Sequence, residues 1–125
     1  GDASVGMIWS GFSAKAREEG ANVEYAFPKE GYVVWMDNIV LLKDAPNRAN
    51  ALKFMNFMLE PENAAALTNF AAYTAGVNGT EPFLSDAVKN SPESNPPATP
   101  VGQLVEACAQ EVQAVYDTIW TNLKK

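Results

Sequence analysis

Short apolar runs separated by polar turns make up the first part of the chain. The run at 5–9 predicts a buried strand, because it is continuous in apolar residues and ends at a Ser-Gly pair. Residues 12–19 have helix-forming composition, and the Gly20 that follows them is typical of a helix C-terminus. Polar and apolar residues alternate over 22–27, which predicts a second strand with one solvated face.

A polar pair interrupts the next apolar stretch. Residues 28–31 read Pro-Lys-Glu-Gly and predict a turn. Residues 32–42 are rich in β-branched and aromatic side chains and should be extended. Asp37 and Asn38 nevertheless lie in the middle of them, and two polar side chains inside such an apolar stretch require an explanation.

Helical spacing dominates the second half of the sequence. Asp44 can cap a helix that has Pro46 in its first turn. Pro61 restarts a second helix, which should run to about Phe70. Apolar residues of the first of these two helices recur at helical spacing and predict a buried stripe. The stripe consists of Ala51, Met55, Met58 and Leu59.

The remainder is expected to combine irregular segments with one long helix. Residues 73–80 contain two glycines and should be irregular. Residues 91–100 hold four prolines, which predicts a surface connector. A final helix from about Gly102 to Asn122 is expected from a second apolar stripe at helical spacing. Its members are Val105, Cys108, Val112, Val115 and Ile119.

Composition favours a folded protein with an acidic surface. The 125 residues are 47% hydrophobic and 19% charged, with a formal net charge of −6. These values argue against disorder of the whole chain, and the length suffices for one domain with a core. Lys and Arg form no cluster, so the sequence lacks the basic footprint of a nucleic-acid-binding protein. An acidic surface suits a cationic partner, although many soluble proteins share it.

Signals for the cellular compartment are sparse. Cys108 is the single cysteine, so no intrachain disulfide is possible and the redox compartment is left open. No apolar run approaches the roughly 20 residues of a membrane helix. Residues 1–4 have neither the basic nor the apolar region of a signal peptide, and the chain does not begin with Met. We therefore expect a mature chain or a fragment of something longer.

The sequence lacks the residue types that common catalytic sites need. There is no histidine, which removes Ser-His-Asp and Cys-His catalysis and most zinc sites. Neither a G-x-x-x-x-G-K-[ST] phosphate loop nor a G-x-G-x-x-G motif occurs. The acidic pairs at 18–19 and at Glu60 and Glu62 are typical of solvated helix surfaces. We predict that the protein is not an enzyme and uses neither a metal nor a cofactor.

Three aromatic residues and one carboxylate remain as candidates for a binding site. Trp9 ends the first apolar run, and Tyr73 follows a predicted helix. Trp35 and Asp37 are two apart in an extended segment, where both can face the same side. Aromatic faces suit the methylene stems and ammonium ends of a polyamine, and a carboxylate forms a charge-assisted hydrogen bond with an ammonium. The alternative is core aromatics with Asp37 at a bend, and spacing alone favours that simpler interpretation.

Several segments occur together in an order and spacing typical of one family. The segments are VGMIWSG at 5–11, FPKEG at 27–31, WMDN at 35–38, LEPENAA at 59–65, AYTA at 72–75 and the last helix over 115–124. The PKEG and WMD strings together are fairly specific, whereas either alone would be weak. On these segments the chain resembles the periplasmic spermidine/putrescine-binding proteins of ABC importers over essentially all of its 125 residues.

The resemblance implies a role for each matching position. Trp9 and Trp35 correspond to the aromatic walls along the polyamine chain. Asp37 corresponds to the carboxylate that receives an amino group, and Tyr73 corresponds to a further pocket residue. Glu106 falls near a polar position, at the start of the last helix, that faces the ligand in some members. An exposed helical glutamate is the simpler interpretation of Glu106.

The resemblance also implies an architecture. The family fold is α/β, a type II periplasmic binding protein in which two lobes built on mixed sheets with flanking helices enclose the ligand, and this chain would be its C-terminal part. Residues 35–37 would form a hinge crossover between the lobes. Residues 1–34 and 81–125 would belong to lobe 2, and residues 38–80 to lobe 1.

The implied partners follow from the same resemblance. They are a polyamine, the membrane permease of the importer and the N-terminal remainder of the same protein. The location would be the periplasm, or the outer surface with a lipid anchor in a Gram-positive source. Two alternatives stay open: a binding protein for another small cationic or organic solute, and a helical interaction module without a ligand.

Overall fold

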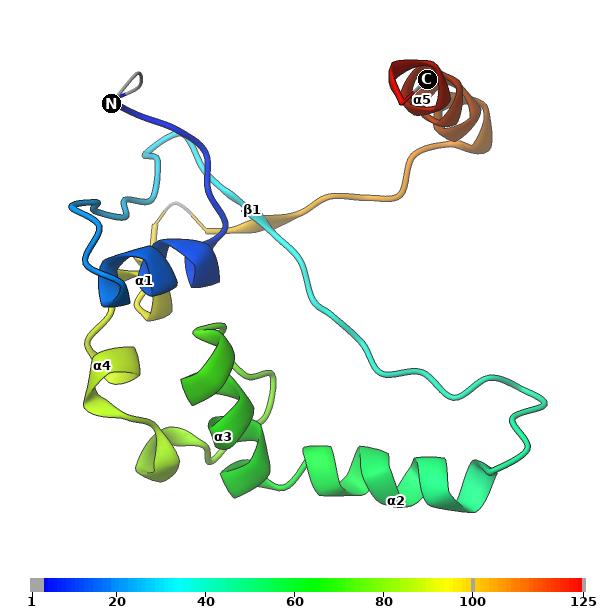
Figure 1. Ribbon diagram of the computed structural model, residues 1–125, viewed down its shortest axis with the longest axis horizontal. Helices are drawn as coiled ribbons and strands as arrows, with labels where there is room; N and C mark the ends of the chain where they lie inside the picture. Colours follow the sequence, from blue (N-terminus) through cyan, green and yellow to red (C-terminus); the bar gives the residue numbers. More distant parts are fainter. Residues whose placement is uncertain (1–3, 100, 125) are drawn as a thin grey trace.

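Helices make up most of the regular secondary structure of the described chain, which covers residues 4–99 and 101–124 of a computed structural model (Figure 1). Within these residues the sheet is a single pair of short parallel strands. In chain order the elements are α1 (Ser10–Glu18), β1 (Val33–Val34), α2 (Arg48–Met58), α3 (Pro61–Ala71), the 3-10 helix η1 (Glu81–Phe83), α4 (Asp86–Lys89), the 3-10 helix η2 (Pro92–Ser94), β2 (Gln103–Leu104) and α5 (Gln110–Leu123).

Local signals set the end of α1. The amide of Gly20 donates to the carbonyl of Arg17 at 2.9 Å. The amide of Ala21 donates to the carbonyl of Ala16 at 2.8 Å, which completes the paired bonds of a Schellman helix end. Gly20 has a φ of 90°, a left-handed conformation that glycine adopts without a steric penalty. The predicted helix and its stop at Gly20 are confirmed.

The start of α2 corrects one prediction, and the start of α3 confirms another. Pro61 opens α3, where its missing amide costs no hydrogen bond. Asp44 does not cap α2, because the helix begins only at Arg48. The amide of Ala45 instead donates to the carbonyl of Leu42 at 3.2 Å and closes a turn that contains Asp44. This turn separates Asp44 from the first amides of the helix.

The apolar stripe of α2 has the predicted spacing but only part of the predicted burial. Ala51, Met55 and Met58 are the half-buried residues of the helix, whereas the other positions are exposed. Leu59, the fourth member of the predicted stripe, is 61% exposed. No residue of α2 is fully buried. The helix therefore presents the expected face without a complete layer of the described chain to cover it.

The predicted strands at 5–9 and 22–27 are wrong. Both segments lack regular secondary structure, and Val5 is 92% exposed. A strand needs a neighbour that pairs its amides and carbonyls, and neither segment has one within the described residues. Side chains hold the second segment instead, since the ring of Tyr25 meets that of Phe27 at 5.2 Å and Phe27 meets Tyr32 at 4.6 Å.

Only a short part of the predicted extended stretch 32–42 forms a strand. β1 pairs in parallel with β2, with Val33 opposite Gln103 and Val34 opposite Leu104. Gly102 allows this approach, because an added Cβ there would lie 2.4 Å from a methyl carbon of Val34. The pairing of β2 also explains why the last helix does not start near Gly102. Residues 103–104 are extended, and α5 begins at Gln110.

The proline-rich segment 91–100 is more ordered than a surface connector. Its first part forms η2, where the hydroxyl of Ser91 accepts a bond from the amide of Ser94 at 3.3 Å. Glu93 within η2 is buried. Pro100 lies outside the described residues. The turn predicted at 28–31 and the irregular segment 73–80 are both observed.

The chain covers little of its own apolar surface. Among the described residues the buried hydrophobic side chains are those of Ala64, Ala65 and Val88. The accessible surface is 10502 Å², whereas a compact monomer of this mass exposes about 6,500 Å². Figure 1 shows α5 apart from the other helices, and all its described side chains are exposed. The core expected from the length of the chain is therefore larger than the core that the described residues form.

Within the described ranges, no helix combines the length and the apolar character that a membrane crossing requires.

Candidate functional site

Four side chains from three separate segments line one cavity. Trp9 precedes α1, Trp35 and Asp37 follow β1, and Tyr73 follows α3. They line an open hollow of about 400 Å³, a volume within the range of roughly 300–1,000 Å³ typical of small-molecule sites. The structure therefore brings together four of the five residues that the sequence suggested for ligand binding.

The aromatic rings form a continuous but open wall. Trp9 and Trp35 have ring centroids 5.3 Å apart at an interplanar angle of 45°. Trp35 meets Tyr73 at 6.1 Å with an angle of 69°, an edge-on contact. Trp9 is 60% exposed and Trp35 is 46% exposed. About half of each indole is therefore open to solvent and can accept a flexible organic ligand or cation.

Asp37 places one unpaired carboxylate beside this wall. It is exposed and shares the cavity with Trp35, two residues earlier. The ion pairs within residues 4–99 and 101–124 are Lys15–Glu18 and Arg17–Glu93, so Asp37 belongs to neither. The side-chain amide of Asn38 donates to the carbonyl of Met36 at 2.9 Å and fixes the backbone on both sides of Asp37. The polar pair inside the apolar stretch is thus explained by a cavity and a local side-chain hydrogen bond to the backbone.

The left-handed backbone conformation of Ala72 sets the direction in which the chain continues to Tyr73. Ala72 ends α3 with a φ of 59°, and its amide donates to the carbonyl of Thr68 at 2.8 Å. A left-handed conformation is unfavourable for alanine. Residues strained in this way are concentrated at functional sites, including ligand-binding sites. Sequence reasoning missed Ala72, because alanine carries no signal for this conformation. Glycine or asparagine at this position would have indicated it.

Glu106 lies outside the cavity. It is exposed and sits in the extended segment between β2 and α5, four residues before the helix that the sequence placed around it. The cavity lining consists of Trp9, Trp35, Asp37 and Tyr73. A ligand contact of Glu106 stays a prediction. Cys108 is likewise exposed in this segment.

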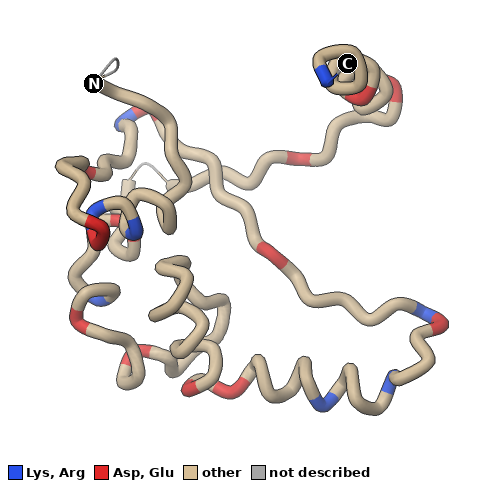
Figure 2. Tube along the Cα trace, in the orientation of Figure 1, with Lys and Arg blue, Asp and Glu red and all other residues tan. Residues whose placement is uncertain are grey.

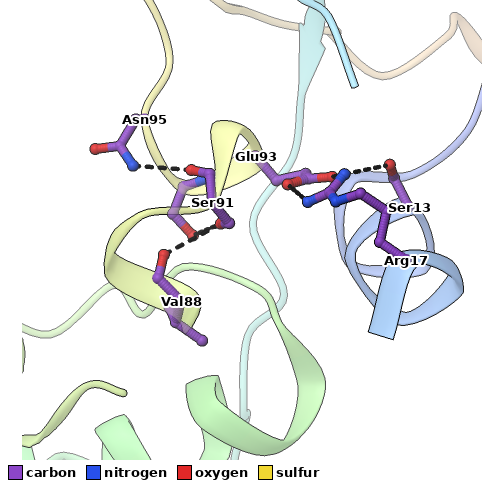
Figure 3. A network of polar contacts seen from close by, with 7 residues as sticks. Ser13, Arg17, Val88, Ser91, Glu93 and Asn95 are labelled. Carbon is purple, nitrogen blue, oxygen red and sulfur yellow. Dashed lines mark hydrogen bonds and ion pairs between the residues drawn. The ribbon is translucent and has the colours of Figure 1, made fainter. Parts of the chain in front are cut away.

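A second polar cluster joins α1 to η2, as Figure 3 shows. Arg17 donates from both terminal nitrogens to the two carboxylate oxygens of Glu93, at 2.5 and 2.6 Å. The Ser13 hydroxyl accepts a longer bond from Arg17 at 3.4 Å. The Glu93 side chain is 0% exposed and that of Arg17 is 28% exposed. Sequence reasoning missed this pair because 76 residues separate its members.

The electrostatics of this cluster indicate a structural role. Burial by itself raises the pKa of Glu93, but the hydrogen bonds from Arg17, with smaller contributions from a backbone amide and Ser13, outweigh burial and lower the pKa below its ordinary value. The bond to Glu93 in turn raises the pKa of Arg17. Both groups stay charged, and two of the guanidinium nitrogens are hydrogen-bonded to the two carboxylate oxygens. Such a pair holds α1 against η2 and has little left for a ligand.

Other kinds of site find no support in the described residues. No group of three or more Cys, Asp or Glu side chains there could hold a metal ion. Figure 2 shows Lys and Arg scattered over several elements rather than gathered on one face, which agrees with the absence of a basic footprint. An open aromatic cavity beside one free carboxylate is the arrangement expected of a site for a small organic cation.

The comparisons with known proteins give the family. The profile of the bacterial extracellular solute-binding proteins matches residues 1–97, and the chain belongs to this family. It is 30% identical to the spermidine/putrescine-binding periplasmic protein of Salmonella typhimurium over 125 residues, which are 99% of this chain and 36% of that protein. It is 34% identical over 98 residues to the Escherichia coli protein of the same name, covering 78% of this chain and 28% of that protein.

A further relative is named for putrescine alone. The chain is 29% identical over 132 residues to the putrescine-binding periplasmic protein PotF of Escherichia coli, covering 99% of this chain and 36% of that protein. The chain thus spans about a third of the length of these relatives. No solved structure matches it significantly.

Proposed function

We propose that the protein is the solute-binding subunit of an ABC importer and that it captures a polyamine, putrescine or spermidine. The observation that carries the proposal is the convergence of Trp9, Trp35, Tyr73 and Asp37 on one cavity of about 400 Å³. Membership of the solute-binding family supports the general role. The polyamine-binding relatives support the choice of ligand.

The chemistry of a polyamine fits the chemistry of the cavity. Its methylene stem can lie along the exposed parts of the Trp9 and Trp35 indoles, which contact each other at a centroid distance of 5.3 Å and form one wall. An ammonium group gains cation–π attraction near these rings. The same group can donate a charge-assisted hydrogen bond to Asp37, which has no ion-pair partner among the described residues. A neutral sugar would leave this carboxylate without a counter-charge.

The cavity also fits a site between two lobes. In the proposed type II arrangement, residues 35–37 form the crossover, and residues 1–34 and 38–80 belong to different lobes. The lining draws on all three, with Trp9 from the first lobe segment, Asp37 from the crossover and Tyr73 from the second. Closure of two lobes around a ligand removes it from water and strengthens each charged contact.

The other wall of the site is proposed to lie outside these 125 residues. One carboxylate cannot neutralise both ends of a diamine, so a second acidic group is needed. The relatives are about three times as long as this chain. The 10502 Å² of exposed surface supports the proposal that further polypeptide covers its apolar faces. The proposed partners are this remaining polypeptide, the polyamine and the membrane permease, and the proposed location is the periplasm or an anchored outer surface.

Calorimetry on the protein expressed from its complete coding sequence tests the function. Putrescine and spermidine should each release heat and bind tightly, whereas neutral amino acids and sugars should not. The same titrations with Asp37→Asn show whether the heat depends on this site. Tight sugar binding together with no polyamine heat would overturn the proposal.

A further inference from the structure

The ring of Tyr73 lies directly on the backbone of Gly11. Gly11 is the second residue of α1 and is buried. A Cβ atom built on it would lie 2.3, 2.5 and 2.8 Å from three ring carbons of Tyr73. Non-bonded carbon atoms prefer about 3.5–4.0 Å, so these separations are far inside contact distance. The observed ring position is possible only because residue 11 has no side chain.

The backbone conformation at Gly11 does not itself require glycine. The glycines with a left-handed φ are Gly20, Gly31 and Gly79 in the described residues. Gly11 instead lies within a helix, where alanine is intrinsically more favourable than glycine. The position therefore excludes alanine because of the tyrosine ring and not because of the chain conformation.

We infer that Gly11 is a positioning residue of the binding cavity, which acts through Tyr73 and thereby sets the affinity for the ligand. The inference rests on the proposed function. The rings of Tyr73 and Trp35 meet edge-on with centroids 6.1 Å apart, so a shift of the tyrosine also changes the contact with Trp35. In the proposed two-lobed arrangement Gly11 and Tyr73 also belong to different lobes. A methyl group between them would hold the two lobes apart as well as move the ring.

The test compares two Gly→Ala variants of the protein expressed from its complete coding sequence. An added Cβ at Gly6 meets nothing within 4 Å, so Gly6→Ala is the matched control. Gly11→Ala should weaken putrescine binding roughly tenfold, the change that corresponds to moderate overpacking, while Gly6→Ala keeps the wild-type affinity. A second measurement uses ligand-free protein labelled with fluorotyrosine, in which the fluorine resonance of Tyr73 is the one that disappears in Tyr73→Phe. Gly11→Ala should shift this resonance.

A double variant separates positioning from a general loss of structure. Tyr73→Ala removes the ring, so Gly11→Ala added to it should cause no further loss of putrescine affinity. Gly11→Ala should lower the melting temperature of the wild-type protein. Added to Tyr73→Ala, it should not lower the melting temperature below that of Tyr73→Ala alone. An equal loss of affinity with and without the ring would overturn the inference, because Gly11 would then act by another route.

The remaining outcomes separate this inference from the proposed function. Normal putrescine binding by Gly11→Ala, with an unmoved Tyr73 resonance, overturns the inference and leaves the function standing. A wild-type protein that releases no heat with putrescine or spermidine overturns the proposed function and the affinity role with it. A shifted Tyr73 resonance in that case would still support the packing of the ring on Gly11.

Discussion

Glu93 and Asp37 are two carboxylates in opposite situations. The Glu93 side chain is 0% exposed and receives two bonds from Arg17 at 2.5 and 2.6 Å. Asp37 is exposed beside three aromatic rings and has no ion-pair partner among the described residues. Loss of a carboxylate whose hydrogen bonds are completed inside the chain leaves its buried partner unpaired and destabilises the fold. A carboxylate left open on a cavity wall is available to a ligand.

The difference between the two regions separates residues that stabilise the fold from residues that are free to contact a ligand. The contact between α1 and η2 is complete in itself, since both its charged groups are satisfied. The cavity has one carboxylate, open aromatic faces and a backbone held in place by Ala72. We expect changes in the first region to alter stability, and changes in the second to alter binding.

The largest effect should come from expressing the 125 residues alone. We expect no measurable polyamine heat, because one exposed ion pair contributes only about 0–1 kcal/mol. The apolar surface of α2 and α5 should also make the isolated chain associate or aggregate. Size-exclusion chromatography with light scattering, with and without putrescine, measures both effects. A stable monomer that binds a polyamine with micromolar affinity would show that these residues form a complete site.

The next largest effect should be on stability, from Glu93→Gln in the complete protein. Removing one charge of a buried pair costs about 3–5 kcal/mol, and we expect the lower end because Arg17 is 28% exposed. Urea unfolding measures the loss, and Glu18→Gln is the matched control. Glu18 pairs with Lys15 at 2.7 Å on the surface, so its loss should cost about 0–1 kcal/mol. Equal losses for both variants would contradict a structural role specific to Glu93.

A comparable effect, on affinity instead of stability, is expected from Asp37→Asn. Loss of a charge-assisted bond in the closed site should cost about 1.5–3 kcal/mol, or roughly 10- to 150-fold in Kd. Glu106→Gln should change Kd far less, because Glu106 is exposed outside the cavity lining. Calorimetry with putrescine measures both variants. Equal affinities for wild type and Asp37→Asn would remove Asp37 from the site.

The helices were predictable because their signals are local. Gly20 ends α1 and Pro61 begins α3, and each acts on bonds within a few residues. The strands predicted at 5–9 and 22–27 were wrong, because strand formation depends on a partner that the segment does not contain. The early start predicted for the last helix failed for a similar reason. Pairing with β1 keeps Gln103 and Leu104 extended.

The site was predictable in its residue types but not in its geometry. The resemblance supplied Trp9, Trp35, Asp37 and Tyr73, and the structure places them around one cavity. Their convergence depends on long-range packing, which spacing along the chain does not encode. The ring contact of Gly11 is a further example, since a glycine inside a helix signals only that some group approaches closely.

Acidification should narrow the stability difference between wild type and Glu93→Gln. The pKa of Glu93 is lowered in the folded protein, so its stabilisation is complete above the pKa of an unfolded glutamate and is lost as the pH falls through the folded value. The effect is smaller than that of the substitution, because burial raises the same pKa and opposes the bonds from Arg17. Urea unfolding across the acid range measures it. A difference that stays constant or widens as the pH falls would contradict the lowered pKa.

The smallest effect should come from Ala72→Gly, at the junction of helix and cavity. Alanine in a left-handed conformation is strained by about 1–2 kcal/mol, while glycine loses about 0.5–1 kcal/mol more backbone entropy on folding. We therefore expect a net stabilisation of about 0.5–1 kcal/mol in urea unfolding. Ala75 is the control, because it lies in the same irregular segment without a left-handed φ. Ala75→Gly should destabilise by about 0.4–1 kcal/mol, and destabilisation by both variants would show that the conformation of Ala72 carries no strain.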